Sequence, residues 1–120
     1  MRRTLLLMLT VSTFACHSTT VESNGVVAKA TPFGITVYNR TEQALAVAAF
    51  DADVLPKLDW TKCATTDQAC LRLAPGVSIQ IPTSQLMGDG KGDIAVYAWT
   101  VWASPNGLWV QDVATLTVPR

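Results

Sequence analysis

The sequence predicts an all-β protein with the architecture of a small antiparallel β-sandwich. Short segments rich in Val, Ile, Thr and aromatic residues recur along the chain, and turn-forming pairs such as Pro-Gly and Asn-Gly separate them. No segment predicts a long helix. An immunoglobulin-like arrangement is one form that such a sandwich can take, and a small closed barrel is the alternative.

Length and charge limit the functions that the chain can have. Its 120 residues suit one domain, and 49% hydrophobic with 15% charged residues is typical of a folded globular protein. Nine basic and nine acidic residues give a formal net charge of zero. A nucleic-acid groove needs a surplus of Lys and Arg on one face, so we expect no nucleic-acid partner.

The first predicted strands cover residues 34–39 and 44–50. In the segment GITVYN, apolar Ile35 and Val37 alternate with other residues, as in a strand with one buried face. The second segment is rich in Ala, which also favours helices, but its Val and Phe residues favour a strand. The short polar link RTEQ between the two segments predicts a hairpin.

Four further strands are predicted in the second half of the chain. The turn pair Pro75 and Gly76 separates the first two strands, and the link Ser-Pro-Asn-Gly joins the last two. Asn106 and Gly107 in this link predict a type I′ hairpin turn, because both residues tolerate positive φ. The four segments are residues 70–73, 77–81, 94–103 and 108–118.

The loop of the last hairpin decides which residues share a face. A two- or four-residue loop pairs odd positions of one strand with even positions of the other. The face predicted to join the core collects Ala95, Tyr97, Trp99, Val101, Leu108, Val110, Ala114, Leu116 and Val118. The opposite, mixed face carries Ile94, Val96, Ala98, Thr100, Trp102, Trp109, Gln111, Val113, Thr115 and Thr117.

Trp102 and Trp109 on this mixed face are the candidate binding residues. Their Thr and Gln neighbours would be costly to bury without partners, so we expect both indoles to be at least partly exposed. An exposed Trp can stack on a sugar ring or anchor a protein partner, and core packing is the alternative for both residues. For Trp99, core packing is the simpler explanation.

The N-terminal segment has the layout of a secretory signal. Arg2 and Arg3 precede an uncharged apolar run over residues 5–15, which ends at the small residue Ala15. As a helix this run spans only ~16 Å, well short of the ~30 Å hydrocarbon core, so it is a poor membrane anchor. We therefore expect residues 1–15 to be a signal peptide that is removed.

A Cys directly after Ala15 resembles the lipobox of bacterial lipoprotein precursors. The resemblance covers the first 16 residues and implies that the thiol of Cys16 receives a diacylglycerol, with palmitate-like acyl chains holding the protein to the membrane. It implies a location in the bacterial cell envelope, facing the periplasm or the exterior. The family usually has Leu and a small residue where this chain has Thr13 and Phe14. Ordinary secretion with an unmodified Cys16 and an uncleaved anchor remain the alternatives.

The rest of the exported chain divides into a tether and a domain. Residues 16–30 show little hydrophobic periodicity and predict a flexible tether. Residues 31–120 predict a single domain. Within it, Cys63 and Cys70 have six residues between them in a polar segment, and we expect them to form a disulfide in an oxidising compartment. A zinc site would need further ligands, and a redox motif would need two intervening residues.

The residues that could carry chemistry are few. His17 is the one histidine, and it lies in the predicted tether, so a Ser or Cys nucleophile has no imidazole base. Asp51 and Asp53 form a possible carboxylate pair, and Asp89 and Asp93 flank glycines, but solvated loops and turns explain both pairs more simply. We expect no metal, no cofactor and no catalysis.

The sequence therefore favours a non-catalytic envelope lipoprotein. Its β-domain would be tethered to the membrane through Cys16 and would bind an envelope protein or a glycan. The alternative is an enzyme, or an enzyme subunit of the envelope, whose active residues are not identified. Acidic side chains that converge in a deep pocket would favour the enzyme, whereas a flat aromatic patch would favour binding.

Overall fold

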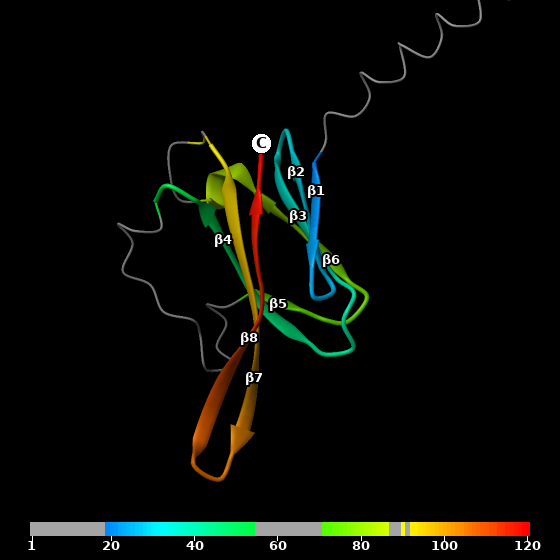
Figure 1. The fold of residues 1–120 in the computed structure, drawn as a ribbon, viewed down its shortest axis with the longest axis vertical. Coiled ribbons are helices and arrows are strands. Elements are labelled where there is room, and N and C mark those ends of the chain that lie inside the picture. Colours follow the sequence, from blue (N-terminus) through cyan, green and yellow to red (C-terminus); the bar gives the residue numbers. More distant parts are fainter. Residues whose placement is uncertain (1–18, 55–70, 87–89, 91) are drawn as a thin grey trace, which may run out of the picture.

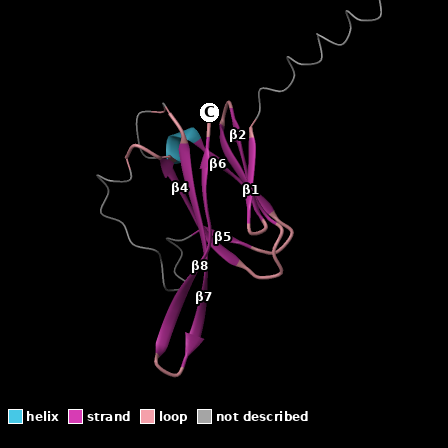
Figure 2. Cartoon of the chain, viewed as in Figure 1, coloured by secondary structure: helices cyan, strands magenta, loops and turns pink. Residues whose placement is uncertain are grey.

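The computed structural model describes residues 19–54, 71–86, 90 and 92–120, which form two antiparallel sheets packed face to face (Figures 1 and 2). The first sheet has the order β1 (Thr20–Ser23), β2 (Val26–Thr31), β3 (Gly34–Asn39) and β6 (Ser78–Pro82). The second has the order β5 (Leu71–Leu73), β4 (Leu45–Asp51), β7 (Ile94–Ser104) and β8 (Gly107–Val118). A short 3-10 helix, η4 (Thr83–Gln85), follows β6. The predicted small antiparallel β-sandwich is confirmed.

The strand order can be compared with that of an immunoglobulin constant domain. β2, β3 and β6 occupy the places of strands A, B and E in one sheet, and β4, β7 and β8 those of C, F and G in the other. β5 lies beside β4 in the second sheet, where the constant domain instead has a D strand in the first sheet. β1 is an additional strand at the edge of the first sheet.

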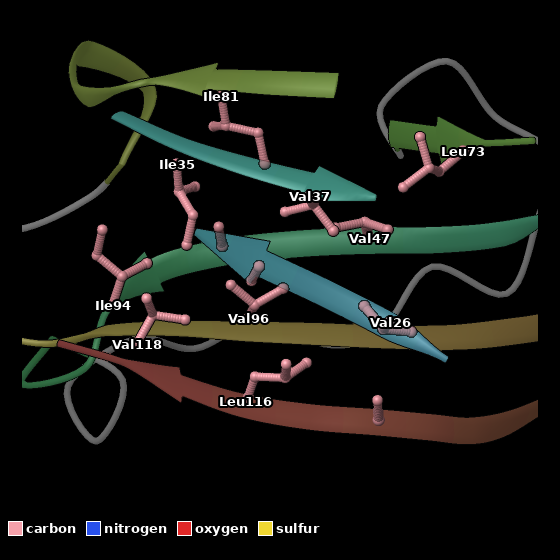
Figure 3. Packing of buried hydrophobic residues seen from close by; sticks show 14 of the residues in the cluster. Val26, Ile35, Val37, Val47, Leu73, Ile81, Ile94, Val96, Leu116 and Val118 are labelled. Carbon is pink, nitrogen blue, oxygen red and sulfur yellow. The ribbon is translucent and has the colours of Figure 1, made fainter. Parts of the chain in front are cut away.

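The core lies between the two sheets and takes alternate residues from each strand (Figure 3). Because alternate residues point to opposite faces, each strand contributes one row of side chains to this layer. Among the buried residues, the first sheet provides Val26, Ala28, Ile35, Val37 and Ile81. The second sheet provides Leu45, Val47, Leu73, Ile94, Val96, Leu116 and Val118.

The predicted hairpin of residues 34–50 is wrong, because β3 and β4 lie in different sheets. Asn39, fully buried at the end of β3, organises the link that crosses between the sheets. Its Nδ2 donates hydrogen bonds to the backbone oxygens of Gln43, at 2.8 Å, and Leu73, at 3.0 Å. Its Oδ1 accepts one from the backbone N–H of Thr41 at 2.9 Å. These bonds satisfy a buried amide and hold the link in a path that a two-stranded hairpin does not follow.

The predicted flexible tether is also wrong for residues 20–30, which lie in the β1–β2 hairpin. Asn24 and Gly25 have φ values of 50° and 85°, which is the signature of a type I′ turn. Val26 and Ala28 of β2 are completely buried in the core. The folded domain thus includes Thr20 and does not begin at residue 31. The prediction failed because β1 is an edge strand with polar residues, which give no hydrophobic alternation.

The turn of the first hairpin contacts the link after β3 and the second sheet. The backbone oxygen of Gly25 accepts a hydrogen bond from the backbone N–H of Arg40 at 2.8 Å. The Nδ2 of Asn24 donates a hydrogen bond to the backbone oxygen of Val113 in β8 at 2.7 Å. A Cβ added to Gly25 would stand 2.8 Å from the Cγ2 of Thr41, so a glycine is required here by both φ and space.

The turn between β7 and β8 lies one residue earlier than predicted. Ser104 pairs with Gly107, so Pro105 and Asn106 form a two-residue loop. Asn24 is the one non-glycine residue with positive φ among the described residues, so Asn106 does not adopt the predicted type I′ conformation. A two-residue loop nevertheless preserves the predicted pairing of odd with even positions near the turn.

A β-bulge corrects the predicted faces of the β7–β8 hairpin. Ala98 pairs with Ala114 but Trp99 pairs with Asp112, which leaves Val113 as an extra residue in β8. Beyond the bulge, even positions pair with even ones. Ile94, Val96 and Ala98, which were predicted on the outer face, therefore belong to the core cluster. Ala95 and Trp99, which were predicted to join the core, are buried outside this cluster.

Candidate binding surface on the distal hairpin

The β7–β8 hairpin extends well past the rest of the sandwich (Figure 1). The pairing of β4 with β7 ends at Ala46 and Trp99, whereas the pairing of β7 with β8 continues to Ser104 and Gly107. Residues 100–111, which we call the distal hairpin, thus form a two-stranded arm. A two-stranded arm without further support is only marginally stable in water, so an arm of this kind suggests a role outside the core.

Trp102 and Trp109 face each other directly across the two strands of the distal hairpin. Directly opposed residues of an antiparallel pair project from the same face, with Cβ atoms about 4.5–5.5 Å apart. The two residues are 45% and 51% exposed, respectively. The predictions that they share one face and that both are partly exposed are confirmed.

The distal hairpin itself carries no charged residue. Thr100 and Gln111 form the next hydrogen-bonded level of the hairpin, with the Oγ1 of Thr100 donating to the backbone oxygen of Gln111 at 3.4 Å. The whole segment from Thr100 to Gln111 contains no Asp, Glu, Lys, Arg or His. The arm therefore presents aromatic area and neutral hydrogen-bonding groups rather than charge.

An open depression of about 580 Å³ lies beside the distal hairpin. Two of its lining residues, Gln43 and Ala44, come from the link that crosses between the sheets, and the others come from the hairpin. The full lining is Gln43, Ala44, Thr100, Val101, Trp102 and Gln111. Amide and hydroxyl groups there can form hydrogen bonds, and the Trp102 indole offers a stacking surface.

Sequence reasoning missed Gln43 and Ala44 as part of this surface. The predicted hairpin placed Gln43 in a turn and Ala44 at the start of the next strand, with no link to residues 100–111. They reach the depression because the Asn39 side chain holds the link across the sandwich. No local pattern marks this placement, since it depends on a hydrogen bond to Leu73, which is 34 positions from Asn39.

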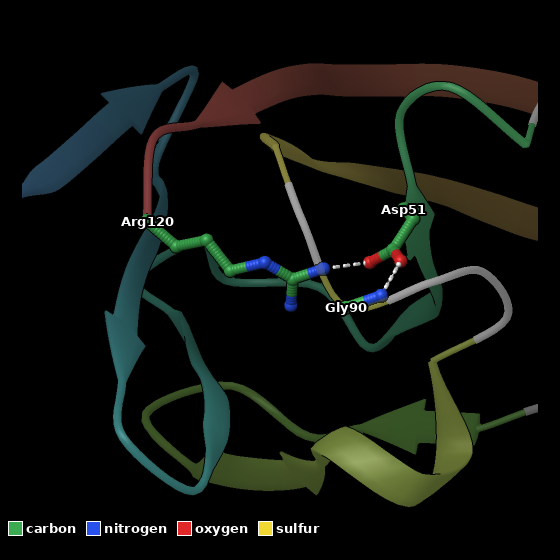
Figure 4. Close-up of polar contacts among 3 residues, drawn as sticks. All are labelled: Asp51, Gly90 and Arg120. Atoms are coloured by element: carbon green, nitrogen blue, oxygen red, sulfur yellow. Dashed lines mark hydrogen bonds and ion pairs between the residues drawn. The ribbon is translucent and has the colours of Figure 1, made fainter.

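The carboxylate considered for catalysis has a structural role at the other end of the sandwich. Asp51 is buried, and its Oδ1 forms an ion pair with the guanidinium of Arg120 (Figure 4). Its Oδ2 accepts a hydrogen bond from the backbone N–H of Gly90 at 2.8 Å. Asp53 is exposed. The Asp51 carboxylate thus joins the end of β4 to Gly90 and Arg120, which gives it a structural role.

Several predicted sites lie outside the described residues. These are Cys16, His17, Cys63, Cys70 and Asp89. Among the residues that are described, no group of three or more His, Cys, Asp or Glu side chains is placed to hold a metal ion. The same part of the chain has no helix with the length and apolar character needed to cross a membrane.

Comparison of the chain with protein-family models, curated proteins and solved structures finds no match. Fold alone does not imply function, because one sandwich architecture supports many unrelated activities. The features that bear on function are therefore the distal hairpin and the N-terminal sequence.

Proposed function

We propose that the chain is the precursor of an exported bacterial envelope lipoprotein, whose non-catalytic β-domain binds an envelope protein or glycan through the distal hairpin. The observation that carries this proposal is the cross-strand pair of exposed Trp102 and Trp109 on a projecting arm. Trp is enriched among the residues that dominate binding energy at protein interfaces, and its ring can also stack on a sugar.

The cost of exposing two indoles supports a binding role. Two adjacent, half-exposed Trp side chains leave a large apolar area in water, and adjacent exposed apolar residues mark interaction sites more often than single ones do. The pair does little for the core, because the core cluster of buried residues contains neither Trp102 nor Trp109. A partner that covers both rings would recover this hydrophobic free energy.

The position of the first described strand supports an anchored domain that presents its arm outward. β1 begins at Thr20, at the end of the sandwich opposite the tip of the distal hairpin (Figure 1). Cys16 precedes Thr20 by only a few residues. A lipid attached at Cys16 would therefore place the membrane at one end and would direct the distal hairpin away from it.

The experiment compares retention on native envelope fragments of exported proteins that all carry Cys16→Ser, so that no lipid anchor contributes to retention. In the double variant Trp102→Ala/Trp109→Ala, we expect retention to weaken about tenfold or more, as for loss of a binding hot spot. We expect the melting temperature to change little, because neither side chain belongs to the core cluster. Phe33→Ala is the matched control, since Phe33 is a 74% exposed aromatic residue outside the arm. Unchanged retention of the double variant would refute the binding role.

A further inference from the structure

The four edge strands of the sandwich each carry a feature that discourages pairing with another chain. β1 is short and includes Glu22, β5 has three residues with Arg72 at its centre, and β6 ends at Pro82. β8 contains Asp112 beside the bulge at Val113. Charges, prolines, bulges and short lengths are the means by which natural sheets protect their edges.

The distal part of β7 is a further edge, and it carries no charge, proline or bulge. Residues 100–104 continue past the last β4–β7 pair, so among the described residues they pair with β8 alone. Their sequence, TVWAS, has no charge and no proline. Their side toward β4 is therefore a short strand edge that no described strand pairs with.

The turn geometry identifies the backbone groups on this open side. A pair that flanks a two-residue loop exchanges both of its hydrogen bonds, so Ser104 directs its backbone groups toward Gly107 in β8. Hydrogen-bonded and non-hydrogen-bonded pairs then alternate, which turns Trp102 and Thr100 toward β8 as well. The backbone N–H and C=O of Val101 and Ala103 consequently face the open side.

The depression provides room along the same edge. Gln43 and Ala44, which line it, immediately precede Leu45, the first residue of β4. The space therefore lies where β4 would run if it began earlier and continued its pairing with β7. Thr100, Val101 and Trp102 line the other side of this space. An extended segment placed there would meet the free groups of Val101 and the indole of Trp102.

We propose that the distal edge of β7 binds an extended, uncharged peptide segment of a partner protein by strand addition. This inference rests on the proposed binding role of the distal hairpin and specifies its partner class. In strand addition, main-chain hydrogen bonds provide affinity, and pockets for alternate side chains provide specificity. Here, backbone hydrogen bonds to Val101 and Ala103 would provide the affinity. The depression beside Trp102, whose lining residues are uncharged, would provide the specificity.

The test uses two peptides and two variants of the exported protein. The probe is a fluorescein-labelled hexapeptide of alternating Thr and Val, and the control peptide is N-methylated at alternate residues. N-methylation removes backbone donors but keeps the side chains, so we expect about tenfold weaker binding by fluorescence anisotropy. Val101→Pro removes the outward N–H and should weaken binding to a similar degree, whereas Val101→Thr keeps the N–H and should bind like the wild type.

The outcomes separate this inference from the proposed function. Equal binding of both peptides, or of the Val101→Pro variant, overturns strand addition, and the peptide comparison stands even if the proline variant fails to fold. Binding of a neutral oligosaccharide in place of the hexapeptide would also overturn strand addition by a partner peptide. So would a concentration-dependent dimer of the protein that Val101→Pro abolishes, because the occupant would then be a second copy of this chain. In each case, loss of envelope retention in the Trp102→Ala/Trp109→Ala variant would still support the binding role of the hairpin.

Discussion

The side chain of Asn24 donates a hydrogen bond of 2.7 Å to the backbone oxygen of Val113, which ties the turn of the first hairpin to the bulge in the opposite sheet. The two residues lie 89 positions apart in the sequence. A bulge leaves its extra residue without a partner in the ladder, and Asn24 provides one here. The bond therefore fixes the sandwich at the point where the distal hairpin leaves it.

Two substitutions at Asn24 should separate this bond from the turn conformation. Asn24→Gly keeps access to positive φ but removes the amide, so we expect a loss of about 0.5–1.5 kcal/mol in the free energy of unfolding. Asn24→Ala should cost roughly 1 kcal/mol more, because Ala is strained at this φ. Urea denaturation of both variants provides the measurement. A glycine variant as stable as the wild type would show that the bond contributes nothing.

Asn39→Asp should destabilise the fold strongly. The substitution is nearly isosteric, but it replaces the Nδ2 donor with an oxygen that faces the backbone oxygens of Gln43 and Leu73. Leaving buried acceptors unpaired beside a buried carboxylate should cost about 3 kcal/mol or more. Thr41→Val is the milder control and should cost about 1 kcal/mol. Thermal unfolding that places the two variants at equal stability would contradict this role of Asn39.

Cys16→Ser should release the protein from the membrane. In our proposal, acyl chains on Cys16 attach the domain to the membrane. Burial of each methylene group of these chains contributes about 0.8 kcal/mol to the attachment. Expressed in a bacterium that processes lipoprotein precursors, the variant should move from the detergent phase to the soluble exported fraction. Cys63→Ser should stay in the detergent phase. An unmodified mature N-terminus in the wild-type mass spectrum would contradict lipidation.

Cys63 and Cys70 should be bonded to each other in the exported protein. Trypsin cleavage after Lys62 and Arg72 would release both residues in one peptide, which should resist alkylation until it is reduced. Reduction should lower the melting temperature without abolishing the fold, since closing so short a loop contributes about 2–3 kcal/mol in the chain-entropy model. Alkylation of both residues before reduction would rule the disulfide out.

Periodicity predicted the strands well because period-2 alternation is a local property. Residues 34–39 form β3 as expected, and the two longest predicted strands are β7 and β8, with ends shifted by a residue. Trp102 and Trp109 were placed on one face because the register near a tight turn follows from loop length. Their exposure was expected from their polar neighbours, whereas in the structure both are exposed because the hairpin extends past the last β4–β7 pair.

Contacts between distant residues explain what periodicity could not provide. The partner of β3 depends on the buried Asn39 side chain, whose hydrogen bond to Leu73 has no local signature. Which residues of β7 face the core depends on the extra residue Val113 in β8. The alternating sequence of β8 gives no sign of this bulge. The first hairpin had a local signal, since Asn24 and Gly25 repeat the Asn-Gly pair of the last link, but their polar surroundings favoured a tether.

Hydrogen–deuterium exchange of the exported Cys16→Ser protein, which has no lipid anchor, with and without native envelope fragments, tests the central claim most directly. Amide exchange is slow where backbone groups are hydrogen-bonded or covered, and a two-stranded arm should exchange readily when free. Binding through the distal hairpin predicts that exchange slows in peptides covering residues 100–111 and stays unchanged in β3 and β6. Slowing confined to the first sheet, or no slowing in residues 100–111 while the protein is retained, would contradict the account.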